Sequence, residues 1–307
     1  MITLVEIFTG TFMLLGGIFG MRQGLQKVFW ARLRDTLHKL TVTPWRGLLF
    51  GVIASAVLQG STGLSLITIS LVSADYLSFY QGLGIILGAN IGTCTTVQLM
   101  TLNFPTSRIV YLLLLALVIM LGSKKLRYIA MSAAGLLSMF SGLALLAHTL
   151  DKLSSLSFIV KCLLIAKTAP LYGIIGGMAI TVLFQSSSAA TGILMLLAAE
   201  GLIDLTTAAY VIYGNNIGSC LSSLVAGTVS SPAGKQLALA HFLLNILGVI
   251  LFYPLTHWLT AISGIFSRDF SVQVATMHAL FNIISSLIIL PFIKQYAALI
   301  VWLVPKR

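Results

Sequence analysis

The chain has 307 residues, of which 58% are hydrophobic and only 8% are charged. Soluble domains carry about 25% charged residues, so this composition excludes a soluble enzyme, a disordered chain and a nucleic-acid-binding protein. The net charge of +11 is typical of a membrane protein whose basic residues gather in cytoplasmic loops beside anionic lipids. Apolar runs of helix-spanning length predict an all-α polytopic protein of the plasma membrane. We expect this membrane to be a bacterial cell membrane.

The chain repeats itself at a spacing of 126 residues, without a gap from residue 47 to residue 100. Polar residues and glycines dominate the matches, so general hydrophobicity does not explain them. The clearest identities pair Gln59 with Gln185, Ser61 with Ser187, Gly88 with Gly214, Asn90 with Asn216 and Cys94 with Cys220. The sequence therefore predicts two repeats and one helix outside them. Their limits are 1–123, 128–255 and 273–293.

Each repeat is expected to begin with an apolar helix, at about 4–21 and 130–147. A segment with basic residues follows, at 22–46 and 149–169. In the first copy, apolar residues of this segment recur at helical spacing. This pattern predicts an amphipathic helix that lies in the membrane interface.

The next element is an apolar pair of arms that is broken at Gln59 or Gln185. Gly47 to Leu58 spans about 18 Å as a helix, and the arm that ends at Phe184 is equally short. The hydrocarbon core is about 30 Å thick, so one arm cannot cross it. We therefore expect two re-entrant hairpins whose tips are buried in protein. The alternative is a continuous helix whose hydroxyl groups bond back to its own carbonyls.

A segment interrupted by glycine and asparagine comes fourth, at 82–100 and 206–226. It contains GANIGT at Gly88–Thr93 and GNNIGS at Gly214–Ser219. We expect an interrupted helix here, with freed carbonyl groups that coordinate a cation. The alternative is close helix packing through small residues. A plain helix then closes each repeat, at 109–122 and 236–254.

Basic residues set the orientation. If each hairpin returns to its starting face, seven crossings remain: 4–21, 82–100, 109–122, 128–148, 206–226, 236–254 and 273–293. With the N-terminus outside, the inner segments contain thirteen Lys and Arg residues and the outer segments five, as the positive-inside rule requires. The two hairpins then start from opposite faces, which predicts inverted-topology repeats of the kind found in secondary transporters.

The candidate site residues are clustered at the two breaks, in Gln59-Gly60-Ser61-Thr62 and in Gln185-Ser186-Ser187-Ser188. Each break starts a new helix, whose free N–H groups favour an anion. Serine and threonine hydroxyls donate hydrogen bonds to anionic oxygens, and their lone pairs can face a small cation. The alternative is that these residues are only N-caps.

All seven acidic residues fall near predicted helix ends or loops, which argues against a proton relay of carboxylates. A neutral site of amides, hydroxyls and carbonyls suits an anion that is carried with Na⁺. We expect no cofactor beyond Na⁺ as coupling ion, and the spacing of Cys94, Cys162 and Cys220 indicates neither a transition metal nor a disulfide set. His241 and His278 are interpreted as bonded core residues, and Asn245 and Asn282 as ties between helices.

These motifs resemble the type II sodium/phosphate cotransporter family, in which a QSSS motif occurs in each of two inverted repeats and a GANIGT-like motif follows. The resemblance spans nearly the whole chain. It implies that the substrates are inorganic phosphate and Na⁺. It also implies that phosphate and Na⁺ are bound by Gln59, Ser61, Thr62, Gln185, Ser186, Ser187 and Ser188. A weaker sodium role falls to Asn90, Thr93, Thr96, Thr191, Asn216, Ser219 and Ser222.

The chain departs from the family pattern in four respects. The first QSSS reads QGST, with Gly60 in place of a serine, and the second GANIGT reads GNNIGS. The His…Phe-Asn helix that often closes the first repeat is missing after Arg108. The PhoU-like domain of many bacterial relatives is not expected in this short form.

The sequence thus predicts sodium-coupled phosphate symport by alternating access, in contact with the lipid bilayer and without nucleic acid; it does not specify an oligomeric state. Three alternatives remain. The same scaffold could carry another oxyanion or export phosphate. The protein could be a transport-dead sensor. Ser61 with His241 or His278 could form an intramembrane serine hydrolase, although neither hairpin has a nearby histidine and a nucleophile needs a base within reach.

Overall fold

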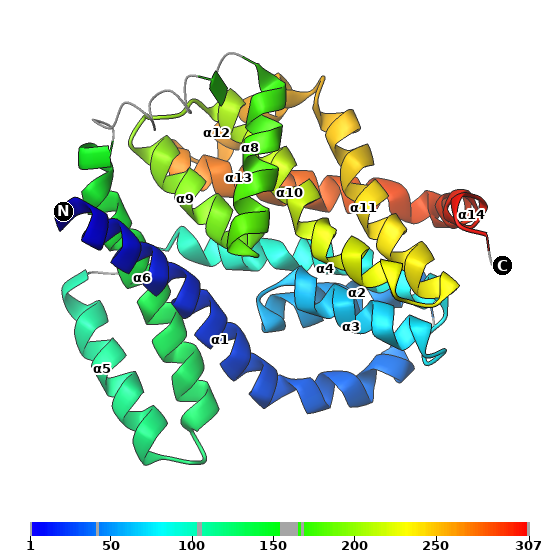
Figure 1. Cartoon of the computed structure of the whole chain (residues 1–307), viewed down its shortest axis with the longest axis horizontal. Helices are drawn as coiled ribbons and strands as arrows, with labels where there is room; N and C mark the ends of the chain where they lie inside the picture. Colours follow the sequence, from blue (N-terminus) through cyan, green and yellow to red (C-terminus); the bar gives the residue numbers. More distant parts are fainter. Residues whose placement is uncertain (1, 41–42, 103–105, 154–164, 167–168, 306–307) are drawn as a thin grey trace.

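The computed structural model describes residues 2–40, 43–102, 106–153, 165–166 and 169–305 (Figure 1). All regular secondary structure in these ranges is helical, which confirms the all-α prediction. The two ends of the chain lie at opposite ends of the molecule in Figure 1.

Five described stretches are long and apolar enough to cross a membrane. They are Val5–Phe29, Phe79–Met100, Arg127–Thr149, Pro232–Phe252 and Phe270–Leu303. Two further predicted crossings are helices that do not meet this criterion. They are α5 (Thr106–Gly122), which has only 17 residues, and α10 (Leu205–Thr228), which contains the GNNIGS motif.

The first 40 residues form one helix, α1 (Ile2–Leu40). The predicted boundary between an apolar helix 4–21 and a separate interfacial segment 22–46 is therefore wrong. Residues 22–40 contain no proline, and Gly24 is used for packing rather than for a break. A Cβ atom added at Gly24 would come within 2.5 Å of the Tyr128 carbonyl oxygen. The helix instead changes direction along its length (Figure 1). Most of the corresponding segment at 149–169 lies outside the described residues.

Helix α1 packs antiparallel against α6 (Arg127–Leu153). Two pairs of glycines form the contact. A Cβ atom added at Gly17 would lie 2.6 Å from the Gly135 oxygen, and one added at Gly142 would lie 2.6 Å from the Gly10 oxygen. The two backbones are thus too close for any larger residue at these positions.

Two pairs of short helices correspond to the predicted broken arms. They are α2 (Pro44–Leu58) with α3 (Ser61–Ser73), and α8 (Pro170–Phe184) with α9 (Ser187–Ala199). The breaks fall at Gln59 and Gln185, which have left-handed backbone angles with φ of 54° and 50°. The predicted positions of both breaks are confirmed, and the alternative of a continuous helix is wrong.

The Gly/Asn motifs lie in uninterrupted helices, α4 (Phe79–Met100) and α10. The prediction that these helices are interrupted is wrong, and the alternative of close packing holds. A Cβ atom added at Gly88 would overlap the carbonyl oxygen of Leu48 in α2. One added at Gly214 would overlap that of Ile174 in α8. The glycines therefore let α4 lie against α2, and α10 against α8, at backbone contact distance.

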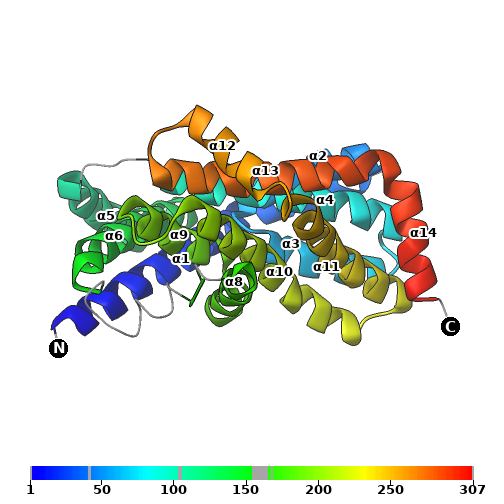
Figure 2. The same ribbon diagram turned by 90° about the horizontal axis from the view of Figure 1, so that it is seen from above.

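The C-terminal part contains helices that the sequence did not indicate. The predicted helices 236–254 and 273–293 appear as α11 (Pro232–Phe252) and α13 (Phe270–Ile289). Between them lies α12 (Thr256–Phe266), and after them come a 3₁₀ turn at Leu290–Phe292 and α14 (Ile293–Leu303). Pro291 in that turn accompanies the change of direction from α13 to α14 (Figure 2).

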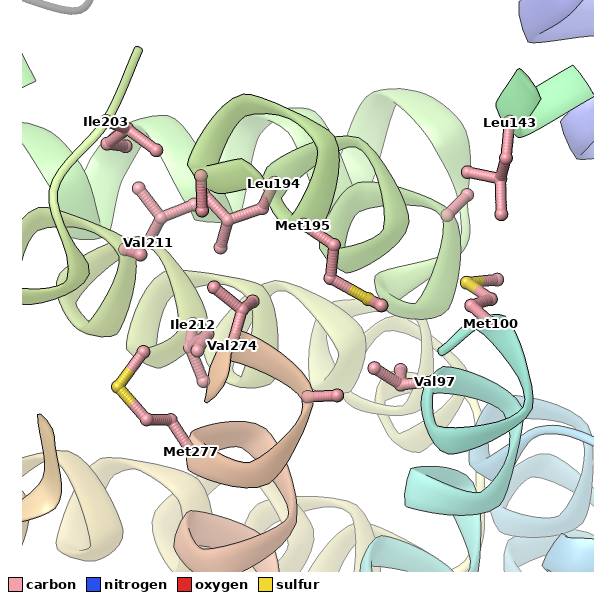
Figure 3. Close-up of a cluster of buried hydrophobic side chains, with 14 of the residues drawn as sticks. Val97, Met100, Leu143, Leu194, Met195, Ile203, Val211, Ile212, Val274 and Met277 are labelled. Carbon is pink, nitrogen blue, oxygen red and sulfur yellow. The ribbon is translucent and has the colours of Figure 1, made fainter. Parts of the chain in front are cut away.

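Buried apolar side chains join the two halves of the chain. Figure 3 shows Met195 of α9 pointing toward Met100 of α4, and Val274 of α13 lying beside Ile212 of α10. These side chains form one hydrophobic cluster. Helix α9 belongs to this cluster through Leu194 and Met195, whereas α3 packs on α4 in a second cluster that contains Leu64 and Leu83.

Candidate functional site

The first break places a glutamine at the end of α2. Gln59 is 7% exposed, and its Nε2 atom donates to the Ala56 carbonyl at 2.5 Å and to Thr95 Oγ1 at 3.5 Å. Its Oε1 atom is buried without a partner among the described residues. Gly60 precedes α3 and contributes no side-chain hydrogen bond, so the first turn of α3 keeps its free N–H groups.

More of the polar side-chain atoms at the second break have hydrogen-bond partners than at the first break. Gln185 Nε2 donates to the Val182 carbonyl at 2.7 Å, and its Oε1 accepts from Ser222 Oγ at 3.0 Å. The Ser186 hydroxyl accepts from the Ala189 N–H and caps α9, so the N-cap alternative holds for this residue. Ser188 is fully buried, and its Oγ has no partner among the described residues.

One small polar cavity brings the two breaks together. It is lined by Thr62, Thr181, Gln185, Ser186, Ser187, Gly218, Ser219 and Ser222. Thr62 comes from the first turn of α3, and all other lining residues come from α8, α9, α10 or the second break. Six of the predicted residues thus meet in one place.

The remaining predicted residues lie elsewhere. Gln59 borders a separate, mostly apolar groove with Ala56, Thr95 and Gln98. Ser61, Ser188, Asn90, Thr93, Thr96, Thr191 and Asn216 do not line the polar cavity. Several of them are bonded within the helix bundle: Thr93 to Ser55 and the Ala89 carbonyl, Thr191 to the Ser187 carbonyl, and Asn216 to the Ile212 carbonyl. Thr96 Oγ1 is buried without a described partner.

A buried hydrogen-bond chain supports the second break and includes residues that the sequence analysis did not name. Thr181 of α8 donates to Asn215 Oδ1 at 3.1 Å, and Asn215 Nδ2 donates to Thr191 Oγ1 of α9 at 3.2 Å. The repeat could have pointed to Thr181, because Ser55 lies 126 residues earlier and is also a hydroxyl residue. Ser55 donates to the Ala89 carbonyl of α4, which is the contact that corresponds to Thr181 with α10. Asn215 replaces the alanine of GANIGT and carried no such signal.

Helices α11 and α13, which contain His241 and His278, are hydrogen-bonded to the long helices α4 and α10. His241 Nε2 lies 3.2 Å from Asn90 Oδ1, and Asn245 Nδ2 donates to Cys220 Sγ at 2.9 Å. Cys94 Sγ similarly contacts the His278 carbonyl at 3.9 Å. The predicted tie by Asn245 is confirmed, and both histidines are buried as expected. No group of metal-binding side chains occurs among the described residues.

Arg22 also lies at the first break, where the sequence analysis counted it only as a cytoplasmic charge. Its Nε atom donates to the Gln59 carbonyl at 2.5 Å. The two residues are 37 positions apart, so nothing in the local sequence indicates this contact.

Comparison with known proteins agrees with these features. The family model described as Na⁺/Pi-cotransporter matches residues 13–148 and 152–282. YqeW of Bacillus subtilis (strain 168), named as uncharacterized, is 30% identical over 312 residues, covering all of both chains. YjbB of Escherichia coli (strain K12), whose name describes inorganic phosphate export, is 26% identical over 302 residues. That alignment covers 97% of this chain and 55% of YjbB.

Shorter matches include the sodium-dependent phosphate transport protein 2A of Oryctolagus cuniculus, 28% identical over 113 residues, which are 34% of this chain and 18% of that protein. No solved structure matches this chain. The chain belongs to the Na⁺/Pi-cotransporter family. It is a multi-pass protein of the plasma membrane and a transporter rather than an enzyme, so the hydrolase alternative is rejected.

Proposed function

We propose that this member of the Na⁺/Pi-cotransporter family moves inorganic phosphate together with Na⁺ across the plasma membrane by alternating access, and that phosphate binds between the two helix breaks. One observation carries the proposal. A polar cavity of about 10 Å³, room for one water molecule, is lined by Thr62 from the first break and by Gln185, Ser186 and Ser187 from the second. The two breaks must move apart for phosphate to bind between them. A site shared by two moving halves is what alternating access requires.

Inverted repeats are part of this proposal. The antiparallel contact of α1 with α6, through Gly10 with Gly142 and Gly17 with Gly135, supports opposite orientations of the two first helices. The contacts of α4 with α2 recur between α10 and α8 at the 126-residue spacing. We keep the limits 1–123 and 128–255 for the repeats. In this scheme, α13 at the C-terminus packs on α4 through Cys94 as α11 packs on α10 through Cys220.

The proposed hairpins re-enter rather than cross the membrane. Helices α2 and α8 have 15 residues each, which gives about 22 Å, and the hydrocarbon core measures about 30 Å. The polar breaks would therefore lie within the membrane. Gln59 and Ser186 are buried in protein as expected, whereas Gln185 is exposed on the surface of the chain.

Neutral oxygen and nitrogen groups line the polar cavity. The hydroxyls of Thr62 and Ser187 donate to phosphate oxygens in this account, whereas the Ser219 hydroxyl donates to the Asn216 carbonyl at 2.7 Å and can offer only its lone pairs. The free N–H groups of the first turn of α3 add a partial positive charge, which favours an anion.

Sodium would bind oxygen atoms that lack protein partners. Gln59 Oε1, Thr96 Oγ1 and Ser188 Oγ are such atoms among the described residues, and Na⁺ prefers oxygen ligands. We assign Ser61, Ser222, Thr93, Thr191, Asn90 and Asn216 a supporting role around these atoms. No cofactor is needed, because coupling relies on the ion itself.

Export is the second candidate for direction, and the name of YjbB favours it. The fold does not impose a direction, because a symporter follows the combined gradients of its substrates. Another oxyanion remains the alternative for the substrate.

Uptake of radiolabelled phosphate into proteoliposomes tests the function. An inward Na⁺ gradient should drive accumulation, K⁺ in its place should not, and an outward Na⁺ gradient should drive efflux. Equal uptake in Na⁺ and K⁺ would overturn the coupling. Uptake of sulfate in preference to phosphate would overturn the substrate.

A further inference from the structure

Arg22 of α1 places a positive charge at the first break. Its Nε atom donates to the Gln59 carbonyl, and the rest of the guanidinium faces Gly60. A Cβ atom added at Gly60 would lie 3.0 Å from Cζ, 3.1 Å from Nε and 3.2 Å from Nη2. A serine side chain at position 60 would therefore press on the guanidinium and shift it by a few tenths of an ångström.

The departure from QSSS at Gly60 thus has a structural counterpart. In the second break, Ser186 keeps its hydroxyl and caps α9. The residue 126 positions after Arg22 is His148, which is exposed. The first break has therefore exchanged a neutral hydroxyl for a guanidinium, and the second has not.

No described carboxylate is placed to neutralise Arg22. Glu6 lies 16 residues earlier on α1, about 24 Å away along the helix. Asp75 follows the far end of α3, and Glu200 and Asp204 lie at the ends of α9 and α10 away from the breaks. A half-buried cation without an ion-pair partner is costly unless a ligand completes it.

The groups around Arg22 complement a tetrahedral oxyanion. The hydrogen bond to Gln59 uses Nε, so the terminal nitrogens can bind two oxygens in the bidentate manner that guanidinium and phosphate share. Gly60 leaves the first N–H groups of α3 without a side-chain cap. Gln59 is only 7% exposed and its Oε1 atom has no partner among the described residues, so a sodium ion held there would lie at the same break as the bound oxyanion.

We propose that Arg22 is a phosphate-binding residue, that it contributes the fixed positive charge of the site, and that Gly60 is required to make room for it. The proposal rests on the proposed function. Thr62 connects the Arg22 position with the proposed phosphate site, because it lies two residues after Gly60 and also lines the polar cavity.

The test measures sodium-driven phosphate uptake by proteoliposomes with Arg22→Gln, Arg22→Lys and Gly60→Ser. Lys27→Gln is the matched control, because it removes an exposed charge from the same helix. Arg22→Gln should raise the half-saturating phosphate concentration about 10-fold or more at saturating Na⁺. Arg22→Lys should raise it less, Lys27→Gln should leave it unchanged, and the half-saturating Na⁺ concentration should change little in all three.

Gly60→Ser should act by displacing the guanidinium. Its effect on the half-saturating phosphate concentration should be large alone and small in the Arg22→Gln background. A wild-type value in active Arg22→Gln protein would overturn the proposal. If that variant does not fold, a wild-type value in Gly60→Ser overturns it equally. Wild-type protein without any phosphate uptake would instead overturn the proposed function, and the Arg22 assignment with it.

Discussion

Ser222 of α10 donates a hydrogen bond of 3.0 Å to the amide oxygen of Gln185. The corresponding pair in the first half, Thr96 and Gln59, is not joined. Thr96 Oγ1 and Gln59 Oε1 are both buried without a partner among the described residues. The two halves thus differ at equivalent positions. Ser222 and Gln185 are hydrogen-bonded to each other, whereas Thr96 and Gln59 each have an oxygen atom that could bind a ligand.

Thr96→Val should weaken sodium binding, because it removes one of these two oxygens at nearly constant volume. We expect the half-saturating Na⁺ concentration to rise about 10-fold. Ser70→Ala is the control, since its hydroxyl is exposed and bonds only to the Leu66 carbonyl. Sodium dependence measured for phosphate uptake checks this prediction, and equal values for Thr96→Val and wild type would contradict it.

Ser188→Ala should impair transport without unfolding the protein. The Ser188 hydroxyl is fully buried and has no described partner, so removing it leaves no protein group unsatisfied. We expect unchanged thermal stability and about a 10-fold loss of apparent affinity for Na⁺ or phosphate. Titrations of both substrates, with thermal unfolding in detergent, separate the two effects. Normal affinity for both substrates would show that this hydroxyl is not a ligand.

Gly214→Ala should destabilise the fold, because the added methyl group would overlap the Ile174 carbonyl oxygen. Overpacking of this kind costs about 1–3 kcal/mol. The control is Gly176→Ala in α8, where an added Cβ atom has no neighbour within 4 Å. Thermal unfolding of both variants decides. Equal stability would mean that α10 does not depend on the close contact.

Labelling of single cysteines tests the inverted topology. A cysteine at Lys125 should react from the cytoplasm and one at Arg268 from outside. Cys94 and Cys220 are buried, so replacing Cys162 gives a usable background. Reaction of both positions from the same side would refute the proposed crossings.

The sequence predicted the breaks well and the Gly/Asn motifs poorly. A polar cluster in an apolar run, together with the short arms, is enough to locate Gln59 and Gln185. Glycine in an apolar helix can either open a turn or admit another backbone, and only the partner helix decides. The carbonyl groups of Leu48 and Ile174 pack against Gly88 and Gly214. They lie more than 35 residues away in the sequence, so the local pattern could not indicate these contacts.

Arg22 could not be predicted as a site residue for a related reason. A basic residue at the end of an apolar helix satisfies the positive-inside rule whether or not it binds a ligand. Its contact with Gln59 depends on the packing of α1 beside α2 and α3. The sequence analysis ended the first helix at residue 21, so it did not foresee that α1 continues past residue 22 and passes the first break.

The most direct test of the central claim, one phosphate site shared by the two breaks, is a double-mutant cycle across the polar cavity. Thr62→Val and Ser187→Ala should each raise the half-saturating phosphate concentration for sodium-driven uptake per molecule of protein in the membrane. The account predicts that the double variant raises it by less than the product of the two single effects, because residues in one network are not additive. A wild-type value in either single variant, or an effect of the double variant equal to that product, would contradict the shared site.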